Sequence, residues 1–449
     1  MTTAVSEDMR ETMSVTSYAV EEDVAVIRFH NPPVNGLSHA ARIAIVEDLD
    51  RALVDPAVRA VVLAGTERAF SAGADVREFN TPKATAAPTL SMVIAALEES
   101  RKPVVAAIAG VCMGGGLELA LGCWQRVARA DARLALPEVK LGLIPGAGGT
   151  QRLPRAVGVE KALNMIVSGE AESAAALADS GLLDQVVDDD PVDAAVRLAR
   201  QFVAGDPPVR LRDRMLTLPN ADGYFAFARE QLAKRKGMPS SALDAVEAVA
   251  AAVGQPFDEG LSIERARFEK CVASDESRAL RHMFFAERHA FRVDDLPPDT
   301  VARPIESAAV VGAGTMGGGI AISLLDAGLP VTLLEAGEEA LQRGVQNIRN
   351  LYEARVRRRR ISADEMESRL ARLQSTVDYD ALASTDVVIE AVFEDMAVKR
   401  EVFQRLDAVM PAGAVLATNT STLDVNAIAA TTGRPQDVVG LHFFSPANV

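Results

Sequence analysis

Glycine-rich turns that directly follow short apolar runs are the strongest constraint on the fold of this sequence. The apolar run 104–108 (VVAAI) leads to the cluster Gly114-Gly115-Gly116, and the run 308–311 (AAVV) leads to Gly312. A helix-like stretch follows each turn. Glycine lets the backbone turn sharply and approach a ligand closely. The repeated order of strand, turn and helix predicts an α/β architecture.

The length of 449 residues predicts two or three domains rather than one hydrophobic core. Residues 1–13 carry acids and lack an apolar core, so a disordered leader is expected there. Residues 14–191 alternate apolar runs, such as 24–29 and 58–63, with turns, and are predicted to form an α/β core. Residues 192–292 show apolar residues at helical spacing, for example in 242–253 and 263–272, and are predicted to be helical.

Paired prolines and acids mark residues 293–303 as a connector between two domains. A second α/β pattern follows from residue 304 to residue 449. Its predicted strands are 331–334, 387–392, 414–418 and 438–444. This pattern, with a glycine-rich turn after its first strand, predicts a Rossmann-type, doubly wound parallel sheet.

The charge and the cysteine content exclude several functional classes. A net charge of −15 argues against a nucleic-acid partner, because phosphate binding needs a basic face. No stretch approaches 18 consecutive apolar residues, so no membrane span is expected. The three cysteines form no CxxC pair, which fits a reducing compartment and predicts no structural zinc or other metal site.

Two glutamates accompany the glycine turns of the first α/β region. Glu118 lies in the first turn of the helix after Gly114–Gly116, and Glu138 precedes a second turn at 145–150 (PGAGGT). A third turn spans 70–75 (FSAGAD). A single glutamate on a helix is usually solvated, and a single glycine turn is usually only a turn. Their joint occurrence indicates a site in which free amide groups and two carboxyls act together.

These segments resemble a known family. FSAGADVREF, GVCMGGGLELALGC and LPEVKLGLIPGAGGTQRLPR are similar, in this order, to the enoyl-CoA hydratase and isomerase branch of the crotonase superfamily. The resemblance implies a crotonase (ββα spiral) fold with a helical C-terminal part. It also implies that the amides of Ala72 and Gly115 form an oxyanion hole, with Glu118 and Glu138 as the catalytic acid/base pair.

The chemistry of hydration agrees with this set of groups. Adding water to an α,β-unsaturated thioester builds negative charge on the thioester oxygen, and two fixed N–H donors stabilise that charge. One carboxylate deprotonates the attacking water, while a second carboxyl protonates C2. We assign Glu118 to the water and Glu138 to the C2 proton. Since multifunctional relatives perform both reactions at one site, Δ3-Δ2-enoyl-CoA isomerase activity is a secondary expectation.

A dinucleotide-binding pattern opens the second α/β region. Gly312, Gly314 and Gly317 form GxGxxG between an apolar strand and a helix, which is the context this fingerprint requires. The next predicted strand ends at Glu335, 23 positions after Gly312 (335 − 312). An acid at this place binds the ribose hydroxyls and repels the extra phosphate of NADP. The pattern therefore predicts NAD as the cofactor.

The region from about 305 to the end resembles the NAD-binding domain of 3-hydroxyacyl-CoA dehydrogenases. The matching segments are VVGAGTMGGGIA, EAVFEDMAVKREVF, TNTSTLD and GLHFFSPA. The resemblance implies that His442 removes the 3-hydroxyl proton and that Ser421 bonds the substrate oxygen, with Glu394 and Lys399 near the nicotinamide ribose. The family's acidic partner of the histidine lies about a dozen residues after it, which would be beyond Val449. The expectation is NAD binding without efficient oxidation by this chain alone.

Three interpretations of function follow. The first is a bifunctional fatty-acid β-oxidation enzyme acting on acyl-CoA thioesters, as in peroxisomal-type multifunctional enzymes and bacterial fatty-oxidation α-subunits. The second is a hydratase or isomerase with a vestigial NAD-binding module. The third is a non-catalytic acyl-CoA or NAD binding protein, which would need neither glutamate. The resemblance implies a cytoplasmic location in a bacterium or a peroxisomal one in a eukaryote, and a homo-oligomer or a thiolase as partner.

Overall fold

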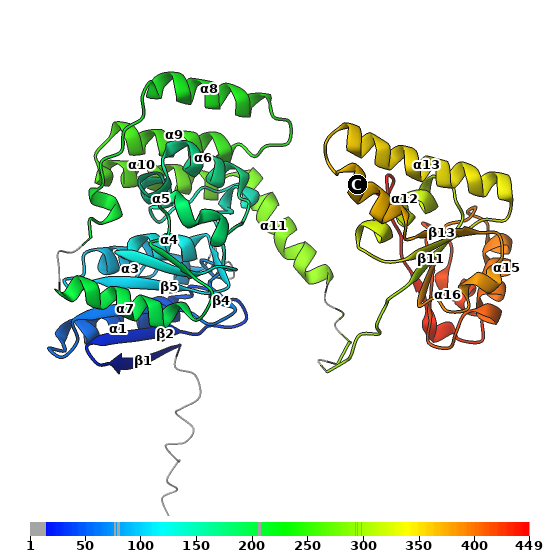
Figure 1. Cartoon of the computed structure of the whole chain (residues 1–449), viewed down its shortest axis with the longest axis horizontal. Coiled ribbons are helices and arrows are strands. Elements are labelled where there is room, and N and C mark those ends of the chain that lie inside the picture. The colour runs from blue at the N-terminus through cyan, green and yellow to red at the C-terminus, as the bar shows by residue number, and fades with distance from the viewer. Residues whose placement is uncertain are drawn as a thin grey trace, which may run out of the picture. The chain divides into compact units, whose positions relative to one another are not determined.

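The structure is a computed structural model that describes residues 15–75, 78, 81–204, 208–291, 293, 295–297 and 299–448. The predicted leader, residues 1–13, lies outside the described residues. The chain divides into two compact units, Met1–Asp294 and Asp295–Val449, shown in Figure 1. Each unit is described by itself.

The first unit contains two sheets whose strands alternate along the chain. The larger sheet has the order β1 (Thr16–Glu21), β2 (Val24–Phe29), β3 (Ala60–Ala64), β5 (Val104–Ile108), β7 (Gln125–Arg129), β10 (Gln185–Val187). The smaller has the order β4 (Ala69–Ser71), β6 (Val111–Met113), β8 (Arg133–Ala135), β9 (Glu172–Ser173). Pairing is parallel except for β1 with β2 and β8 with β9. Strands β3, β5 and β7 are each followed directly by a strand of the smaller sheet.

Helices cover both faces of the larger sheet. The helices of this unit are α1 (His39–Val54), α2 (Pro82–Thr85), α3 (Leu90–Glu98), α4 (Gly115–Gly122), α5 (Gly149–Val157), α6 (Val159–Ser168), α7 (Pro191–Ala204), α8 (Ala221–Lys234), α9 (Ser241–Gly254), α10 (Phe257–Val272) and α11 (Asp275–Ala290). Helix α7 packs on one face, where Ala195 and Ala199 meet Val62 and Val105. The other face and α9 share a second core that includes Ile45, Leu63 and Val249. The predicted helical region is thus part of the same compact unit as the α/β core.

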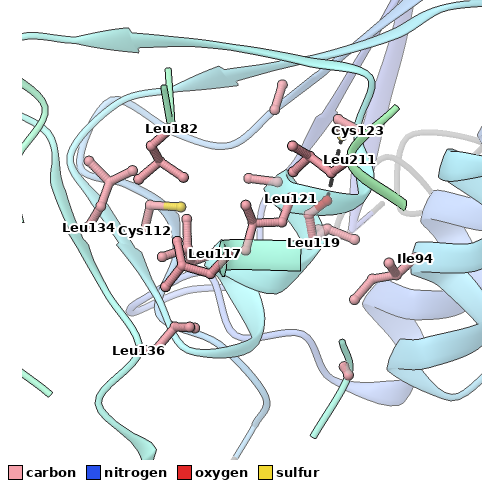
Figure 2. Close-up of a cluster of buried hydrophobic side chains, with 14 of the residues drawn as sticks. Ile94, Cys112, Leu117, Leu119, Leu121, Cys123, Leu134, Leu136, Leu182 and Leu211 are labelled. Carbon is pink, nitrogen blue, oxygen red and sulfur yellow. Dashed lines mark hydrogen bonds between the residues drawn. The ribbon is translucent and has the colours of Figure 1, made fainter. Parts of the chain in front are cut away.

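Helix α4 is buried on all of its sides. Leu117, Leu119 and Leu121 are at most 1% exposed, although they point in different directions around the helix. Figure 2 shows them among apolar side chains from several other segments, which include Ile94, Cys112, Leu134, Leu136, Leu182 and Leu211. A helix that is apolar all round is typical of a protein interior. This packing holds the backbone of α4, and with it the direction of Glu118.

The second unit is a six-stranded parallel sheet with the order β13 (Leu373–Thr376), β12 (Val331–Leu334), β11 (Ala308–Val311), β14 (Val387–Glu390), β15 (Val415–Thr418), β16 (Val438–Gly440). Its helices are α12 (Thr315–Asp326), α13 (Glu338–Arg357), α14 (Ala363–Leu370), α15 (Met396–Val409) and α16 (Val425–Ala429). Counted within the unit, this is the order 3-2-1-4-5-6 of a dinucleotide-binding sheet, with its topological switch between β11 and β14. The prediction of a doubly wound parallel sheet is confirmed.

Several predicted strands coincide with the observed ones, and others differ at their ends: the strands predicted at 58–63, 387–392 and 414–418 are Ala60–Ala64, Val387–Glu390 and Val415–Thr418. The strands at 24–29, 104–108 and 331–334 have the predicted bounds. The strand predicted at 438–444 ends at Gly440, because its partner β15 ends at Thr418 and offers only three paired positions. The Leu441 N–H still donates to the Thr418 carbonyl oxygen at 2.9 Å. His442 therefore follows the strand instead of lying within it.

Among the described residues, no helix combines the length and the apolar character that crossing a membrane requires. Within the same ranges, no cluster of histidine, cysteine and acidic side chains is arranged to hold a metal ion.

The core around α4 makes a testable contribution to stability. Replacing the fully buried Leu119 by alanine should lower the free energy of unfolding of the first unit by about 2–5 kcal/mol, because a cavity remains. The Val54→Ala substitution, at a side chain that is 78% exposed, is the matched control and should cost less than about 0.5 kcal/mol. Trp124 is the only tryptophan and packs against this core, so its fluorescence during denaturation reports on this unit. Equal losses in both variants would contradict the prediction.

Candidate active site and dinucleotide site

Three glutamates bring their carboxyl groups into one buried cluster in the first unit. Glu118 lies on α4 and is 3% exposed, and Glu264 lies on α10 and is 1% exposed. Glu138 begins a short 3-10 helix, Glu138–Leu141, and the negative charge of Glu118 acts on it directly. The sequence predicted Glu118 and Glu138 but not Glu264. The available signal was an acid next to Ile263, within a stretch of apolar residues at helical spacing.

The turn that leads into α5 donates two hydrogen bonds to Glu118. The N–H groups of Ala147 and Gly149 both donate to Oε1 of Glu118, each at 2.8 Å. No side chain could be added at Gly149, because a Cβ there would lie 2.9 Å from this oxygen. The second predicted glycine turn is therefore a carboxylate-binding loop for the first predicted glutamate.

Glu118 and Glu138 lie in different electrostatic environments, which shift the pKa values of their carboxyl groups to different extents. Burial raises the pKa of Glu118, while the amides of Ala147 and Gly149 and the charge of Arg152 oppose the rise. Burial and the negative charge of Glu118 raise the pKa of Glu138 well above its ordinary value. Neighbouring carboxyls in such a site do not both ionise readily. The donors therefore favour the negative charge on Glu118 and the proton on Glu138.

One carboxyl oxygen of Glu138 is available for chemistry. Oε2 is shielded from solvent and has no hydrogen-bond partner among the described residues. A buried polar atom without a partner costs free energy, and such atoms are found where a ligand or water completes the site. The position of Glu138 is therefore suited to a group that exchanges a proton with a bound substrate.

The amide donors of the predicted oxyanion hole are placed only partly as expected. The N–H of Ala72 donates to the carbonyl oxygen of Val34 at 3.1 Å, so the prediction of a free donor at Ala72 is wrong. Gly115 is the first residue of α4, where backbone N–H groups have no partner within the helix. A Cβ on Gly115 would lie 3.2 Å from the backbone nitrogen of Ala74. The N–H of Ala74 has no acceptor in the described part of the chain, so Ala74 and Gly115 form the pair of neighbouring free donors.

A cavity of about 720 Å³ adjoins the carboxylate-binding loop. Its wall is formed by α3, by the loop itself and by α10, and its lining includes Thr89, Ala95, Gly146, Leu261 and Glu264. This volume lies in the range of small-molecule sites. The cavity thus adjoins both the loop and Glu264, and it offers a space in which part of a ligand can lie.

The glycine turn of the second unit has the backbone that a dinucleotide requires. Gly312 has φ +104°, which disfavours any residue with a side chain. A Cβ on Gly317 would lie 1.8 Å from the Gly312 carbonyl oxygen, so the helix packs on the strand only with glycine there. Around Gly314 an added Cβ would meet open space, at the start of α12 where N–H groups point forward. These residues fit a pyrophosphate at the helix N-terminus.

Glu335 follows β12 and reaches the glycine turn. Its Oε2 accepts a hydrogen bond from the N–H of Ala313 at 2.8 Å, and its Oε1 accepts one from Ala336 at 2.8 Å. The carboxylate is therefore fixed beside the turn, as an acid that binds the ribose hydroxyls must be. Its place in the structure is the place that the sequence spacing predicts.

A network of charges spans the carboxyl ends of β14 and β15. Lys399 is 1% exposed and lies 2.7 Å from Oε1 of Glu390 and 3.2 Å from Oε2 of Glu394. Although burial opposes it, hydrogen bonds from Thr420 and Ser421 and the charge of Lys399 lower the pKa of Glu394 to about 2. The sequence predicted Glu394 and Lys399 in one region. It missed Glu390, whose carboxylate is wholly buried and also accepts from Thr418.

The two predicted dehydrogenase side chains lie at the same sheet edge but differ in their contacts. Ser421 donates to Glu394, with its N–H at 3.0 Å and its hydroxyl at 3.4 Å. His442 is exposed, and its ring centroid lies 4.9 Å from that of Phe444. Within the described ranges, no carboxylate forms an ion pair or a hydrogen bond with His442. This site is more open than the cluster of buried glutamates in the first unit.

Comparison with known proteins gives a family for each unit. The family described as "Enoyl-CoA hydratase/isomerase" matches residues 19–216. The family described as "3-hydroxyacyl-CoA dehydrogenase, NAD binding domain" matches residues 307–449. The two matches fall in the two compact units: the first includes Glu118 and Glu138 but ends before Glu264, and the second includes the GxGxxG turn.

Curated relatives match nearly the whole length of this chain. The "Peroxisomal bifunctional enzyme" of Danio rerio is 43% identical over 438 residues, which are 96% of this chain and 60% of the relative. The human protein of that name is 42% identical over 434 residues, with 95% and 59% covered. The "Peroxisomal fatty acid beta-oxidation multifunctional protein MFP2" of Arabidopsis thaliana is 36% identical over 442 residues, with 95% and 61% covered. The chain thus spans about 60% of the length of the relatives it matches.

The buried acid on α10 predicts how stability depends on pH. Burial and the charge of Glu118 raise the pKa of Glu264 to about 8, from an ordinary value of 4.5. The folded state therefore holds a proton that the unfolded state releases between these values, so the stabilisation is complete below 4.5 and is lost as the pH rises through about 8. The melting temperature of the first unit should fall by several degrees between about pH 5 and about pH 9. In Glu264→Gln this fall should be smaller, and an equal fall would contradict the assignment.

Proposed function

The chain belongs to the enoyl-CoA hydratase/isomerase family through its first unit and to the 3-hydroxyacyl-CoA dehydrogenase family through its NAD-binding second unit, and we propose that it is a fatty-acid β-oxidation enzyme. The first unit would add water to trans-2-enoyl-CoA thioesters and give L-3-hydroxyacyl-CoA. The single observation that carries this proposal is the unequal pair of buried carboxyls, Glu118 with two amide donors and Glu138 with a free oxygen.

In the proposed reaction each group has one task. The N–H groups of Gly115 and Ala74 hold the thioester oxygen and stabilise the charge that develops there. Glu118 accepts a proton from water as the water oxygen bonds to C3. Glu138 gives its proton to C2, so the C2–C3 double bond becomes single and both additions occur on the same face. Ala74 takes the role that the sequence assigned to Ala72, because the N–H of Ala72 already donates to the carbonyl oxygen of Val34.

The retained pair of carboxyls also supports isomerase activity. A carboxyl that protonates C2 can, in the deprotonated form, remove a proton from the same carbon and return it elsewhere. Moving a proton between C2 and C4 in this way would convert a 3-enoyl thioester into a 2-enoyl thioester. We propose this as a secondary activity of the first unit.

For the second unit we propose binding of NAD at the turn Gly312, Gly314 and Gly317, with Glu335 at the ribose hydroxyls. Bound there, NAD would supply hydride-accepting chemistry for C3 of the hydroxyacyl thioester. His442 would take the hydroxyl proton, and Ser421, held by Glu394, would bond the substrate oxygen. A histidine base without an orienting carboxylate loses charge compensation. Oxidation by this unit is therefore proposed for the chain when further sequence supplies that partner.

One alternative function and the biological setting are also proposed. A hydratase with a vestigial NAD module is the second candidate, favoured by the exposed and unpaired ring of His442 in the described residues. The names of the relatives, which are peroxisomal, support a peroxisomal location if the source is eukaryotic; a cytoplasmic location is proposed for a bacterial source. A homo-oligomer or a thiolase is the proposed partner. We also propose the boundaries 14–191, 192–292, 293–303 and 304–449 for the functional regions.

The acid/base assignment predicts the effect of two neutral substitutions. In Glu118→Gln or Glu138→Gln, hydration of crotonyl-CoA should fall by about 10²–10⁴-fold, because each variant loses a positioned proton-transfer group. KM should change little, since neither carboxyl is needed to bind the thioester. The assay follows the loss of the enoyl-thioester absorbance. Near-normal rates in both variants would refute the assignment, and an inactive parent protein would refute the proposed function.

NAD binding is tested by the melting temperature of the second unit. Saturating NAD should raise it, because a ligand that binds only the folded state stabilises that state by about 3–4 kcal/mol at 100–1,000 times Kd. NADP should raise the melting temperature much less than NAD does. In Glu335→Ala, the rise with NAD should be smaller, and the difference between the rises with NAD and with NADP should shrink. Gly337→Ala is the matched control, since an added Cβ there meets open space. An unchanged melting curve with NAD would contradict NAD binding.

A further inference from the structure

Glu264 is the buried acid for which the proposed reaction has no task. It lies on α10, outside the segments that carry the other site residues, and it is 1% exposed. Burying a carboxyl is costly unless hydrogen bonds compensate the loss of water. The donors that compensate Glu264 all come from one place, the carboxylate-binding loop before α5.

The loop divides its amide groups between two carboxyls in strict alternation. Ala147 and Gly149 donate to Glu118, as described above. Gly148 donates to Oε1 of Glu264 at 2.6 Å, and Thr150 donates to Oε2 with its N–H at 2.9 Å and with its hydroxyl at 2.5 Å. Successive N–H groups therefore point in opposite directions. Glu118 lies on one side of the loop and Glu264 on the other.

Helix α10 is pressed closely against this loop. A Cβ on Gly146 would lie 2.5 Å from the ring of Phe268 on α10, and a Cβ on Gly260 would lie 2.1 Å from Oε1 of Gln151. Arg152 forms an ion pair with Glu98 and also donates a hydrogen bond to the Ala147 carbonyl oxygen at 3.2 Å, which is a third contact that fixes the loop. The position of the loop is thus fixed by side chains of α3, α5 and α10.

We propose that Glu264 is a positioning residue for the hydratase reaction: by binding Gly148 and Thr150, it fixes the loop so that the N–H groups of Ala147 and Gly149 both meet Glu118. This inference rests on the proposed hydratase function. Its chemical content is that the loop amides keep Glu118 ionised and correctly directed toward water. Without Glu264, the N–H groups of Gly148 and Thr150 lose their acceptor. The loop then no longer directs the N–H groups of Ala147 and Gly149 toward Glu118.

A glutamine at position 264 is the sharpest test of the role of Glu264. Its amide oxygen can replace one carboxyl oxygen, but its NH₂ group directs two hydrogens toward Gly148 or Thr150, where the protonated carboxyl directs only one. In Glu264→Gln, kcat for crotonyl-CoA should fall by about 10–100-fold, as expected for an ångström-scale misplacement, while KM stays within about twofold. Glu259→Gln, an exposed acid on the same helix, should retain parental values.

The pH profile separates positioning from a general loss of folded protein. The charged groups that face Glu118 are Glu138 at the 3-10 helix, Arg152 on α5 and Glu264 on α10. Hydrogen bonds from the loop lower the pKa of Glu118, so losing them raises it. The acidic limb of kcat/KM should therefore move to higher pH in Glu264→Gln, by about one unit. A smaller fraction of folded protein would lower the rate but would not change the pH at which the acidic limb of kcat/KM falls.

Thr150 provides a second pair of variants that leaves the charge at position 264 intact. Thr150→Val removes the hydroxyl donor and should show the lower kcat and the shifted limb, whereas Thr150→Ser retains the hydroxyl and should restore both. This pair decides the question if Glu264→Gln does not fold. If the parent protein is active and both Glu264→Gln and Thr150→Val show the kcat and pH profile of Glu259→Gln, the inference is overturned while the proposed function stands. An inactive parent protein would overturn the proposed function and this inference together.

Discussion

The carboxylate-binding loop, residues 145–150 at the start of α5, is the part on which the site of the first unit depends. Its N–H groups serve two carboxyls, Glu118 on α4 and Glu264 on α10, and its conformation is possible because Gly148 adopts φ +103°. The backbone donors of one short segment thereby hold two buried acids close together. The arrangement places most of the hydrogen-bond stabilisation on one carboxylate oxygen of Glu118, which leaves its second oxygen for other partners.

The surrounding fold supplies the rigidity that this loop needs. Helix α4 is packed by leucines on all sides, so the backbone that bears Glu118 cannot adapt to a poorly placed loop (Figure 2). The alternating strands of two sheets bring the start of α4 beside the turn at 72–74, where Ala74 and Gly115 offer free N–H groups. Donors and carboxyls thus come from segments that only the sheet topology brings together. Fixed groups of this kind stabilise developing charge without reorganising during the reaction.

The second unit uses a different physical device. Its glycine turn and the N-terminus of α12 present backbone N–H groups at the switch point of a parallel sheet, and Glu335 lies beside them. The buried pair Lys399 and Glu390 ties α15 to the end of β14 and holds Glu394 ionised at the sheet edge. The first unit keeps its acids away from water, whereas the second presents His442 at the surface.

The sequence by itself determined the α/β class and a division into domains, and it indicated Glu118, Glu138 and the dinucleotide turn as candidate sites. These follow from local patterns, because glycine spacing and apolar runs are read directly along the chain. Three features were decided only by the tertiary structure. The N–H of Ala72 is bonded to Val34, so the free donor beside Gly115 belongs to Ala74. Glu264 is more than 100 positions from the loop it binds, and Glu390 is buried by partners from two other segments. Hydrogen bonds across such separations depend on how helices and strands pack, and no local pattern in the sequence records that packing.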